Sequence, residues 1–172
     1  MSVFLITITV LRIIHIVAGV CWIGGNIIQA AFLEPTARAT APEGGRFMEH
    51  LMFRGRFATF MSVSAILTIV AGALLYWYRS GGQIAAWMTS GTGMAFTIGS
   101  VFGLVAAGIG FFVMAPTAKQ LGEIGHSIQG APTAGQLAAM GQLRARMSQA
   151  GRVEVIVGVL SLLLMAGARY IV

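Results

Sequence analysis

Acidic residues and cysteine are nearly missing from this sequence. It contains no aspartate, five glutamates and a single cysteine, Cys21. The scarcity of carboxylates argues against a paired-carboxylate catalytic site and against an oxygen-lined calcium or magnesium site. One cysteine excludes an internal disulfide and a thiolate-rich metal site. The chain also has no P-loop, nucleophile elbow or HExxH motif, so nothing indicates nucleotide or hydrolase chemistry.

Charge of either sign is scarce. Only 9% of the 172 residues are charged and 57% are hydrophobic, whereas a soluble domain has roughly 25% charged residues. Such a chain cannot make a soluble surface, so we expect the lipid bilayer to be its main partner. The net charge of +6 then indicates membrane orientation. It does not indicate nucleic-acid binding, because no stacking aromatics are interleaved with a basic patch.

Four stretches are apolar enough to span a bilayer, for which about 20 residues are needed. They cover residues 13–33, 57–78, 91–115 and 153–171. Apolar residues extend the first stretch back to Val3, and we expect a retained helix rather than a signal peptide. A short amphipathic helix over 46–56, with apolar contacts from Phe47, Leu51 and Phe53, should precede the second span. The predicted fold is an all-α integral membrane four-helix bundle that forms one domain over residues 1–172.

Basic residues gather in two of the three connections between these spans. Eight of the 11 lie there: Arg38, Arg46, Arg54, Arg56, Lys119, Arg144, Arg146 and Arg152. By the positive-inside rule, we expect both termini to lie outside and both long basic loops to lie in the cytoplasm. The membrane would be a bacterial-type inner (plasma) membrane.

The sequence also contains an imperfect internal repeat. The residues Pro35-Thr36-Ala37-Arg38 match Pro116-Thr117-Ala118-Lys119 at an offset of 81, and Arg54-Gly55-Arg56 match Arg144-Ala145-Arg146 at an offset of 90. Each copy, 1–80 and 90–172, holds two spans, so the two copies should be parallel rather than inverted.

A polar stripe runs along the first span. Its members recur at spacings of three and four residues, which places them on one face of a helix: Arg12, His15, Gly19, Trp22, Asn26 and Gln29. Such a stripe is costly in lipid and should face a partner helix, a ligand or a water-filled cavity. The repeat counterparts of His15, Trp22 and Asn26 are Phe96, Gly103 and Ala107. We therefore expect any chemistry to lie in the first half.

His15 is the leading candidate for a functional residue, because it lies near the middle of a span. It could be an axial ligand to haem or a ligand to copper. The alternative is a hydrogen bond to a neighbouring helix, for instance to Ser62, Ser64 or Thr68. Arg12, one turn away, could pair with a haem propionate or simply snorkel to the interface.

The remaining stripe residues have two interpretations each. Trp22 could stack on a macrocycle or pack in the core. Gly19, with Gly24 and Gly25, would let either a flat ligand or a helix approach closely. Asn26 could hydrogen-bond across helices.

Other polar and small residues suggest local roles. His50 should lie on a solvated basic face, and His126 should be exposed in a glycine-rich loop. Glu154 is expected to pair with Arg152 or a loop arginine, with a proton relay as the alternative. The series Gly99-x-x-x-Gly103-x-x-x-Ala107 should let another helix pack closely.

The run from His15 to Gly25, with the pattern His-x6-Trp-x-Gly, resembles a first-helix signature. That signature is shared by the copper-resistance D (CopD) membrane domain, the HemJ-type protoporphyrinogen oxidases and related small four-helix membrane families. The resemblance implies a haem b or copper site centred on His15. Only one of the three histidines lies in a span, so one chain cannot supply a bis-histidine haem site. The second axial position would be open, filled by methionine or supplied by a second copy.

These observations lead to three hypotheses. The first is a haem-b-binding membrane protein with a redox or porphyrin-related role, in which His15 is the axial ligand and Arg12, Gly19, Trp22 and Asn26 surround the cofactor. The second is a copper-handling CopD-like domain. The third is a cofactor-free structural or assembly subunit of a larger membrane complex. A homodimer is compatible with the first.

Overall fold

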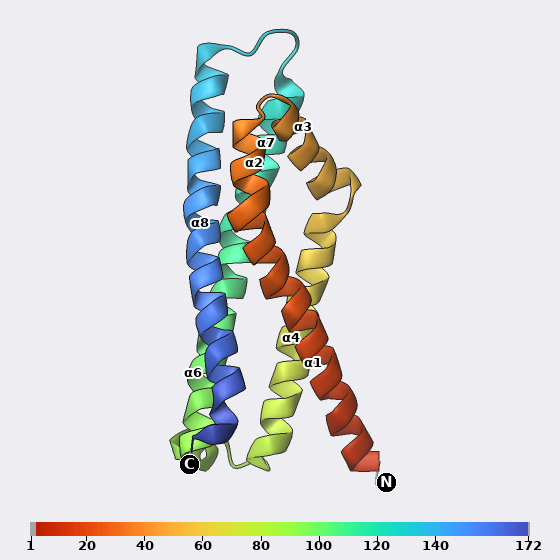
Figure 1. The fold of residues 1–172 in the computed structure, drawn as a ribbon, viewed down its shortest axis with the longest axis vertical. Helices are drawn as coiled ribbons and strands as arrows, with labels where there is room; N and C mark the ends of the chain where they lie inside the picture. The colour runs from red at the N-terminus through yellow and green to blue at the C-terminus, as the bar shows by residue number, and fades with distance from the viewer. Residues whose placement is uncertain (1–2, 172) are drawn as a thin grey trace.

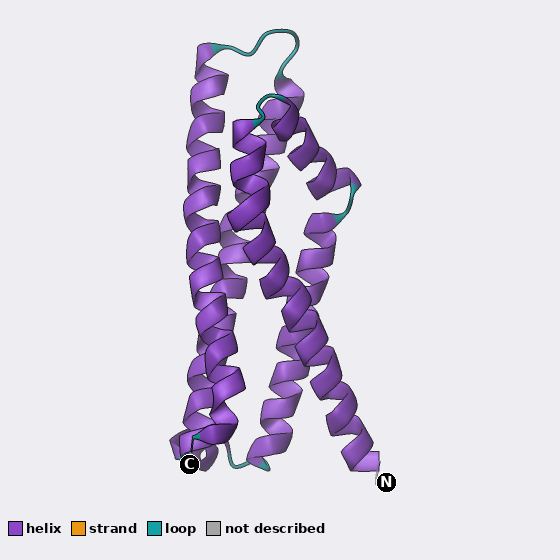
Figure 2. Cartoon of the chain, in the orientation of Figure 1, coloured by secondary structure: helices purple, strands orange, loops and turns teal. Residues whose placement is uncertain are grey.

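The structure is a computed structural model that describes residues 3–171, and this part of the chain is helical with no strand (Figures 1 and 2). Four helices are long and apolar enough to cross a membrane, as the sequence predicts. They run Val3–Ala39, Phe57–Ser80, Gly91–Ser127 and Ala134–Tyr170. Most of their large apolar side chains are exposed on the outside of the bundle. This arrangement fits a multi-pass membrane protein.

The first long helix continues through a proline. It consists of α1 (Val3–Ile28), a five-residue π-helical segment (Gln29–Leu33) and α2 (Glu34–Ala39). Pro35 has no amide hydrogen and its ring crowds the preceding turn, which normally kinks or ends an α-helix. Here the turn before the proline widens, and the amide of Glu34 donates to the carbonyl of Gln29. The chain therefore stays helical past the end predicted near residue 34.

The third long helix shows the same feature. It consists of α6 (Gly91–Ile109), a π-helical segment (Gly110–Met114) and α7 (Ala115–Ser127), with Pro116 in the first turn of α7. We call the two π-helical segments the wide turns. They begin 81 positions apart, which is the offset between the two proline motifs in the sequence.

A short helical segment precedes the second span, close to the predicted position. It comprises α3 (Glu43–Glu49) and a π-helical turn (His50–Arg54). Arg56 then adopts a left-handed conformation with φ 56° and starts α4 (Phe57–Ser80). Phe47 and Phe53 are 56% and 54% exposed within the chain. The amphipathic character of this segment stays a prediction.

The connection before the fourth span differs most from the sequence prediction. Instead of a long basic loop, α7 and α8 (Ala134–Gly167) form a helical hairpin joined by residues 128–133. Thr133 and Gln136 form a reciprocal capping box that starts α8. His126 lies in the last turn of α7 rather than in a loop. Both helices therefore extend well beyond the length needed to cross the hydrocarbon.

The four long helices run alternately up and down, and both ends of the chain lie at the same end of the bundle (Figure 1). The closest pairs are consecutive in the sequence: α1 packs on α4, and α6 packs on α8. Contacts between these pairs, α1 with α8 and α4 with α6, are more limited. At the lower end, α5 (Ile84–Thr89) links α4 to α6.

The buried core is small and rich in alanine. Its members come from all four long helices: Trp22, Ile23, Ala65, Ala106 and Ala107, with Ile27, Met61, Ile69 and Val157 packed against them. Small side chains let helices approach closely, which is how helices associate when lipid removes the hydrophobic driving force. The two-repeat organisation stays a prediction, to which the wide turns and the pairing of consecutive helices add support.

Candidate functional site

The polar stripe of α1 divides between two neighbouring helices. His15 and Gly19 face α4, where they meet Thr68 and Gly72. Trp22 is 5% exposed in the buried core, and Asn26 reaches α8. Arg12 is exposed. His15, Gly19, Trp22 and Asn26 thus face partner helices, as the cost of polar groups in lipid requires, whereas Arg12 does not, and the stripe residues meet different neighbours.

His15 is held at the seam between α1 and α4. Its Nδ1 lies 2.8 Å from the backbone carbonyl oxygen of Thr68, which lies at the middle of α4. A carbonyl oxygen only accepts hydrogen bonds, so Nδ1 carries the proton and donates it. In the neutral tautomer that donates from Nδ1, the nitrogen with a free lone pair is Nε2. Of the partners expected from the sequence, Thr68 is correct, although its backbone rather than its hydroxyl makes the bond.

Gly72 makes room for the imidazole. A Cβ added to Gly72 would lie 2.8 Å from Cε1 and 3.0 Å from Nδ1 of His15, distances at which the ring would have to move. A Cβ on Gly19 would lie 3.6 Å from Cγ2 of Thr68, which is ordinary contact. Gly19 therefore contributes to the packing of α1 on α4, and Gly72 leaves the space that the His15 ring occupies.

A second polar pair lies in the bundle between the first and last helices. Nδ2 of Asn26 donates a 2.7 Å hydrogen bond to Oε1 of Glu154, and the two residues are 9% and 3% exposed. The expected pairing of Glu154 with Arg152 or a loop arginine is wrong, because the ion pairs within residues 3–171 are Arg38 with Glu34 and Lys119 with Glu123. The Glu154 side chain points inward instead, and a Cβ on Gly110 would lie 3.4 Å from its Oε1. Gly110 begins the second wide turn. Sequence reasoning missed this pair because its members are 128 positions apart.

The small residues of α6 pack as predicted. A Cβ on Gly99 would lie 3.3 Å from Cβ of Leu164, and one on Gly103 would lie 3.3 Å from Oγ of Ser161. Ser161 also donates a 2.7 Å hydrogen bond to the carbonyl oxygen of Gly99. This face of α6 is therefore covered by α8 of the same chain.

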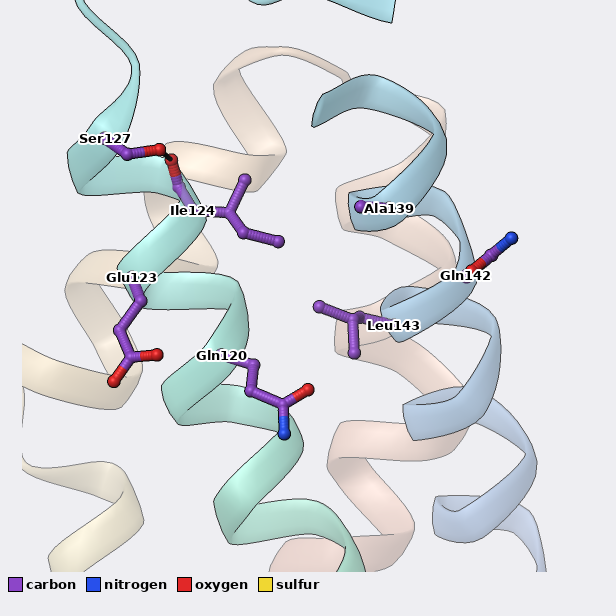
Figure 3. A pocket seen from close by; sticks show the side chains of 7 residues that line it. All are labelled: Gln120, Glu123, Ile124, Ser127, Ala139, Gln142 and Leu143. Atoms are coloured by element: carbon purple, nitrogen blue, oxygen red, sulfur yellow. Dashed lines mark hydrogen bonds between the residues drawn. The ribbon is translucent and has the colours of Figure 1, made fainter. Parts of the chain in front are cut away.

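Two hollows lie at the end of the bundle that carries α2, α3 and α7. The larger, about 450 Å³, is a shallow groove between α7 and α8 (Figure 3). Its lining is mostly uncharged: Gln120, Glu123, Ile124, Ser127, Ala139, Gln142 and Leu143. The smaller, about 320 Å³, contains His50 and His126, which come from opposite halves of the sequence. The sequence gives no direct sign that these two histidines are neighbours.

Metal ligands do not converge in the described part of the chain. Within residues 3–171, no three His, Cys, Asp or Glu side chains form a group that could hold a metal ion. A metal at His15 would thus have fewer than three such protein ligands from the described part of this chain. Comparison with known protein families, with curated proteins and with solved structures finds no match to this chain.

Proposed function

We propose that this protein is a haem-b-binding membrane protein with a redox role, and that His15 supplies an axial ligand through Nε2. The observation that carries the proposal is the hydrogen bond from Nδ1 of His15 to the Thr68 carbonyl. In metal-binding histidines, the nitrogen that does not bind the metal commonly donates to a backbone carbonyl, which orients the ring and increases the basicity of the ligating nitrogen.

The residues around His15 fit a single axial bond. The ring is partly exposed at the edge of the α1–α4 seam, and Gly72 leaves room for it. Arg12 lies one helical turn away and is exposed, where it would pair with a propionate. Trp22 and Asn26 contribute packing and a hydrogen bond within the bundle instead. The proposal is therefore restricted to His15 and Arg12, with Gly72 as a further supporting residue.

When bound, haem b supplies a one-electron Fe(III)/Fe(II) couple. The contributions of the chain are the fixed imidazole, the positive charge of Arg12 and an apolar surrounding. The apolar stretches 13–33, 57–78, 91–115 and 153–171 contain no histidine besides His15, because His50 and His126 lie beyond them in the sequence. Any second ligand to the haem iron would therefore come from a non-histidine group or from His15 of a second copy.

The experiment is an absorption spectrum of the purified protein, before and after addition of haemin. We expect a Soret band in the wild type and its loss in His15→Ala. The matched control is His126→Ala, which removes an exposed histidine in the last turn of α7 and should keep the band. Absence of the band from the wild type even with haemin would contradict the proposal, as would an unchanged band in His15→Ala.

The alternatives predict different results in the same preparation. Elemental copper without pigment would favour the copper-handling function. Neither metal nor pigment, together with a co-purifying membrane partner, would favour an assembly subunit. That third function has less support, because the small-residue face of α6 already packs on α8.

The proposal includes a membrane placement and a parallel repeat. Both termini would lie outside a bacterial-type inner membrane. The opposite end of the bundle, which carries the two basic connections, would lie in the cytoplasm. This placement is supported by the distribution of arginine and lysine. The repeat is supported by the matching wide turns before Pro35 and Pro116. A pseudo-two-fold axis along the membrane normal would then relate α1–α4 to α6–α8.

A further inference from the structure

The hollow of about 320 Å³ lies where the two halves of the protein meet, at the end of the bundle opposite both termini. One side is formed by α3 and the turn that follows it, and the other side by α7, whose labels lie next to each other in Figure 1. Its lining consists of Arg46, Glu49, His50, Phe53, Arg54 and His126. The ring of Phe53 reaches across to α7, where a Cβ on Gly122 would lie 3.9 Å from it.

Nitrogen donors dominate this hollow. Arg46, His50 and Arg54 are spaced by four residues along one helical segment, and His126 faces them from α7. The ion pairs within residues 3–171 are Arg38 with Glu34 and Lys119 with Glu123. Neither arginine of the hollow is therefore neutralised by Glu49, the one carboxylate in the lining. Both guanidinium groups keep hydrogen-bond donors for a ligand.

These groups select for an anion over a metal ion. Two guanidinium groups repel a cation, and the two histidines with Glu49 do not form a three-ligand group in the described chain. The planar fork of arginine matches the geometry of phosphate oxygens, and imidazole N–H groups add further donors. We infer that the hollow binds a phosphate-bearing anion, clamped between Arg46 and Arg54 on one side and His126 on the other.

Such an anion would bridge the two halves at the basic end. The ligand is either a free phosphate compound or the phosphate of an anionic lipid headgroup, since Arg54 lies three positions before α4 enters the apolar span. The chemistry of recognition is the same for both sources. The inference does not depend on the haem proposal, because the hollow and His15 share no residue.

Two binding measurements on the full-length protein distinguish the sources. The first titrates inorganic phosphate against protein in neutral detergent and follows the ³¹P NMR line width. The second uses native mass spectrometry to count phosphatidylglycerol retained after purification from mixed phosphatidylcholine and phosphatidylglycerol nanodiscs. Saturable binding in the first supports a free phosphate ligand, and specific retention in the second supports a lipid headgroup.

Three variants test the residues. The double variant Arg46→Gln/Arg54→Gln should weaken whichever binding is observed by at least tenfold. The matched control Lys119→Gln/Arg146→Gln removes two positive charges from the same end of the bundle but from outside the hollow, and should change binding less than twofold. His126→Gln, on the other half of the chain, should also weaken binding.

The outcomes are decisive as long as circular dichroism and gel filtration show that each variant is folded. No saturable binding of either probe by the wild type would overturn the inference. Equal loss in the double variant and its control would also overturn it, because it would reveal only general electrostatic attraction. Unchanged binding in His126→Gln would refute a clamp between the two halves.

Discussion

The side-chain amide of Asn26 donates a 2.7 Å hydrogen bond to Glu154, and this bond joins the first long helix of the bundle to the last. Both residues are buried. A polar group without a partner in such a place is costly. The bond therefore connects the two pairs of helices, α1–α4 and α6–α8, whose other mutual contacts are limited.

Loss of this bond should destabilise the protein. Asn26→Ala and Glu154→Ala each leave the partner buried and unsatisfied, which costs about 1–3 kcal/mol. Glu154→Gln keeps an oxygen that can accept from Asn26 and should stay close to the wild type. Thermal unfolding in one detergent checks this, with the exposed Glu123→Ala as control. Equal unfolding midpoints for wild type, Asn26→Ala and Glu154→Ala would show that the bond does not contribute to stability.

Gly72→Ala should impair haem binding through the position of His15. The added Cβ would lie 2.8 Å from Cε1 of the imidazole, so the ring must shift, and we expect its bond to the Thr68 carbonyl to weaken. We expect haem affinity to fall about tenfold, which corresponds to 1.4 kcal/mol. Haemin titration measures it. Gly24→Ala is the matched control, since nothing lies within 4 Å of its Cβ position. Equal affinities in the two variants would disprove this role of Gly72.

Arg12→Gln should weaken haem binding without abolishing it. An exposed ion pair contributes about 0.2–1 kcal/mol, so a loss of the propionate partner should lower affinity by about 1.4- to fivefold. Arg12→Lys keeps the positive charge, so its haem affinity should lie between that of the wild type and that of Arg12→Gln. Haemin titration again gives the affinity, with Arg79→Gln at the end of α4 as control. If Arg12→Gln and Arg79→Gln bind haem like the wild type, Arg12 only anchors the helix at the interface.

Tyr76 and Thr97 should be energetically coupled. The hydroxyl oxygens lie 2.6 Å apart, and Thr97 uses its own proton on the carbonyl of Gly93 at 2.7 Å. Tyr76 must therefore be the donor, and this bond joins α4 to α6. A double-mutant cycle with Tyr76→Phe and Thr97→Val should give a coupling of about 0.6 kcal/mol, the average for such bonds between membrane helices. Strictly additive effects would mean that the two hydroxyls do not interact.

The four spans were predictable because their cause is local. An uncharged run such as 13–33 or 57–78 has the length and apolarity that lipid requires, and the observed helices contain those runs. The extension of α8 back to Ala134 was missed because the residues before Val153 are too polar to signal a span. The signal that could have found it is the capping sequence Thr133 to Gln136.

The site was predictable only in part. Spacing placed His15, Trp22 and Asn26 on one face of α1, and their burial or contacts agree with that. Which neighbour each of these residues contacts depends on how α1 crosses α4 and α8. The periodicity of the sequence does not predict that crossing. Asn26 therefore bonds to Glu154, and His50 lines the same hollow as His126. Both pairs are too far apart in the sequence for a local pattern to predict them.

The pairing of consecutive helices has a consequence for biosynthesis. A chain is made from its N-terminus, so α1 and α4 can associate in the membrane before α6 exists, and α6 and α8 can do so next. The contact between Asn26 and Glu154 has to wait until the last helix has been inserted. Until then Asn26 lacks this partner, and a chain truncated before residue 154 would never gain it.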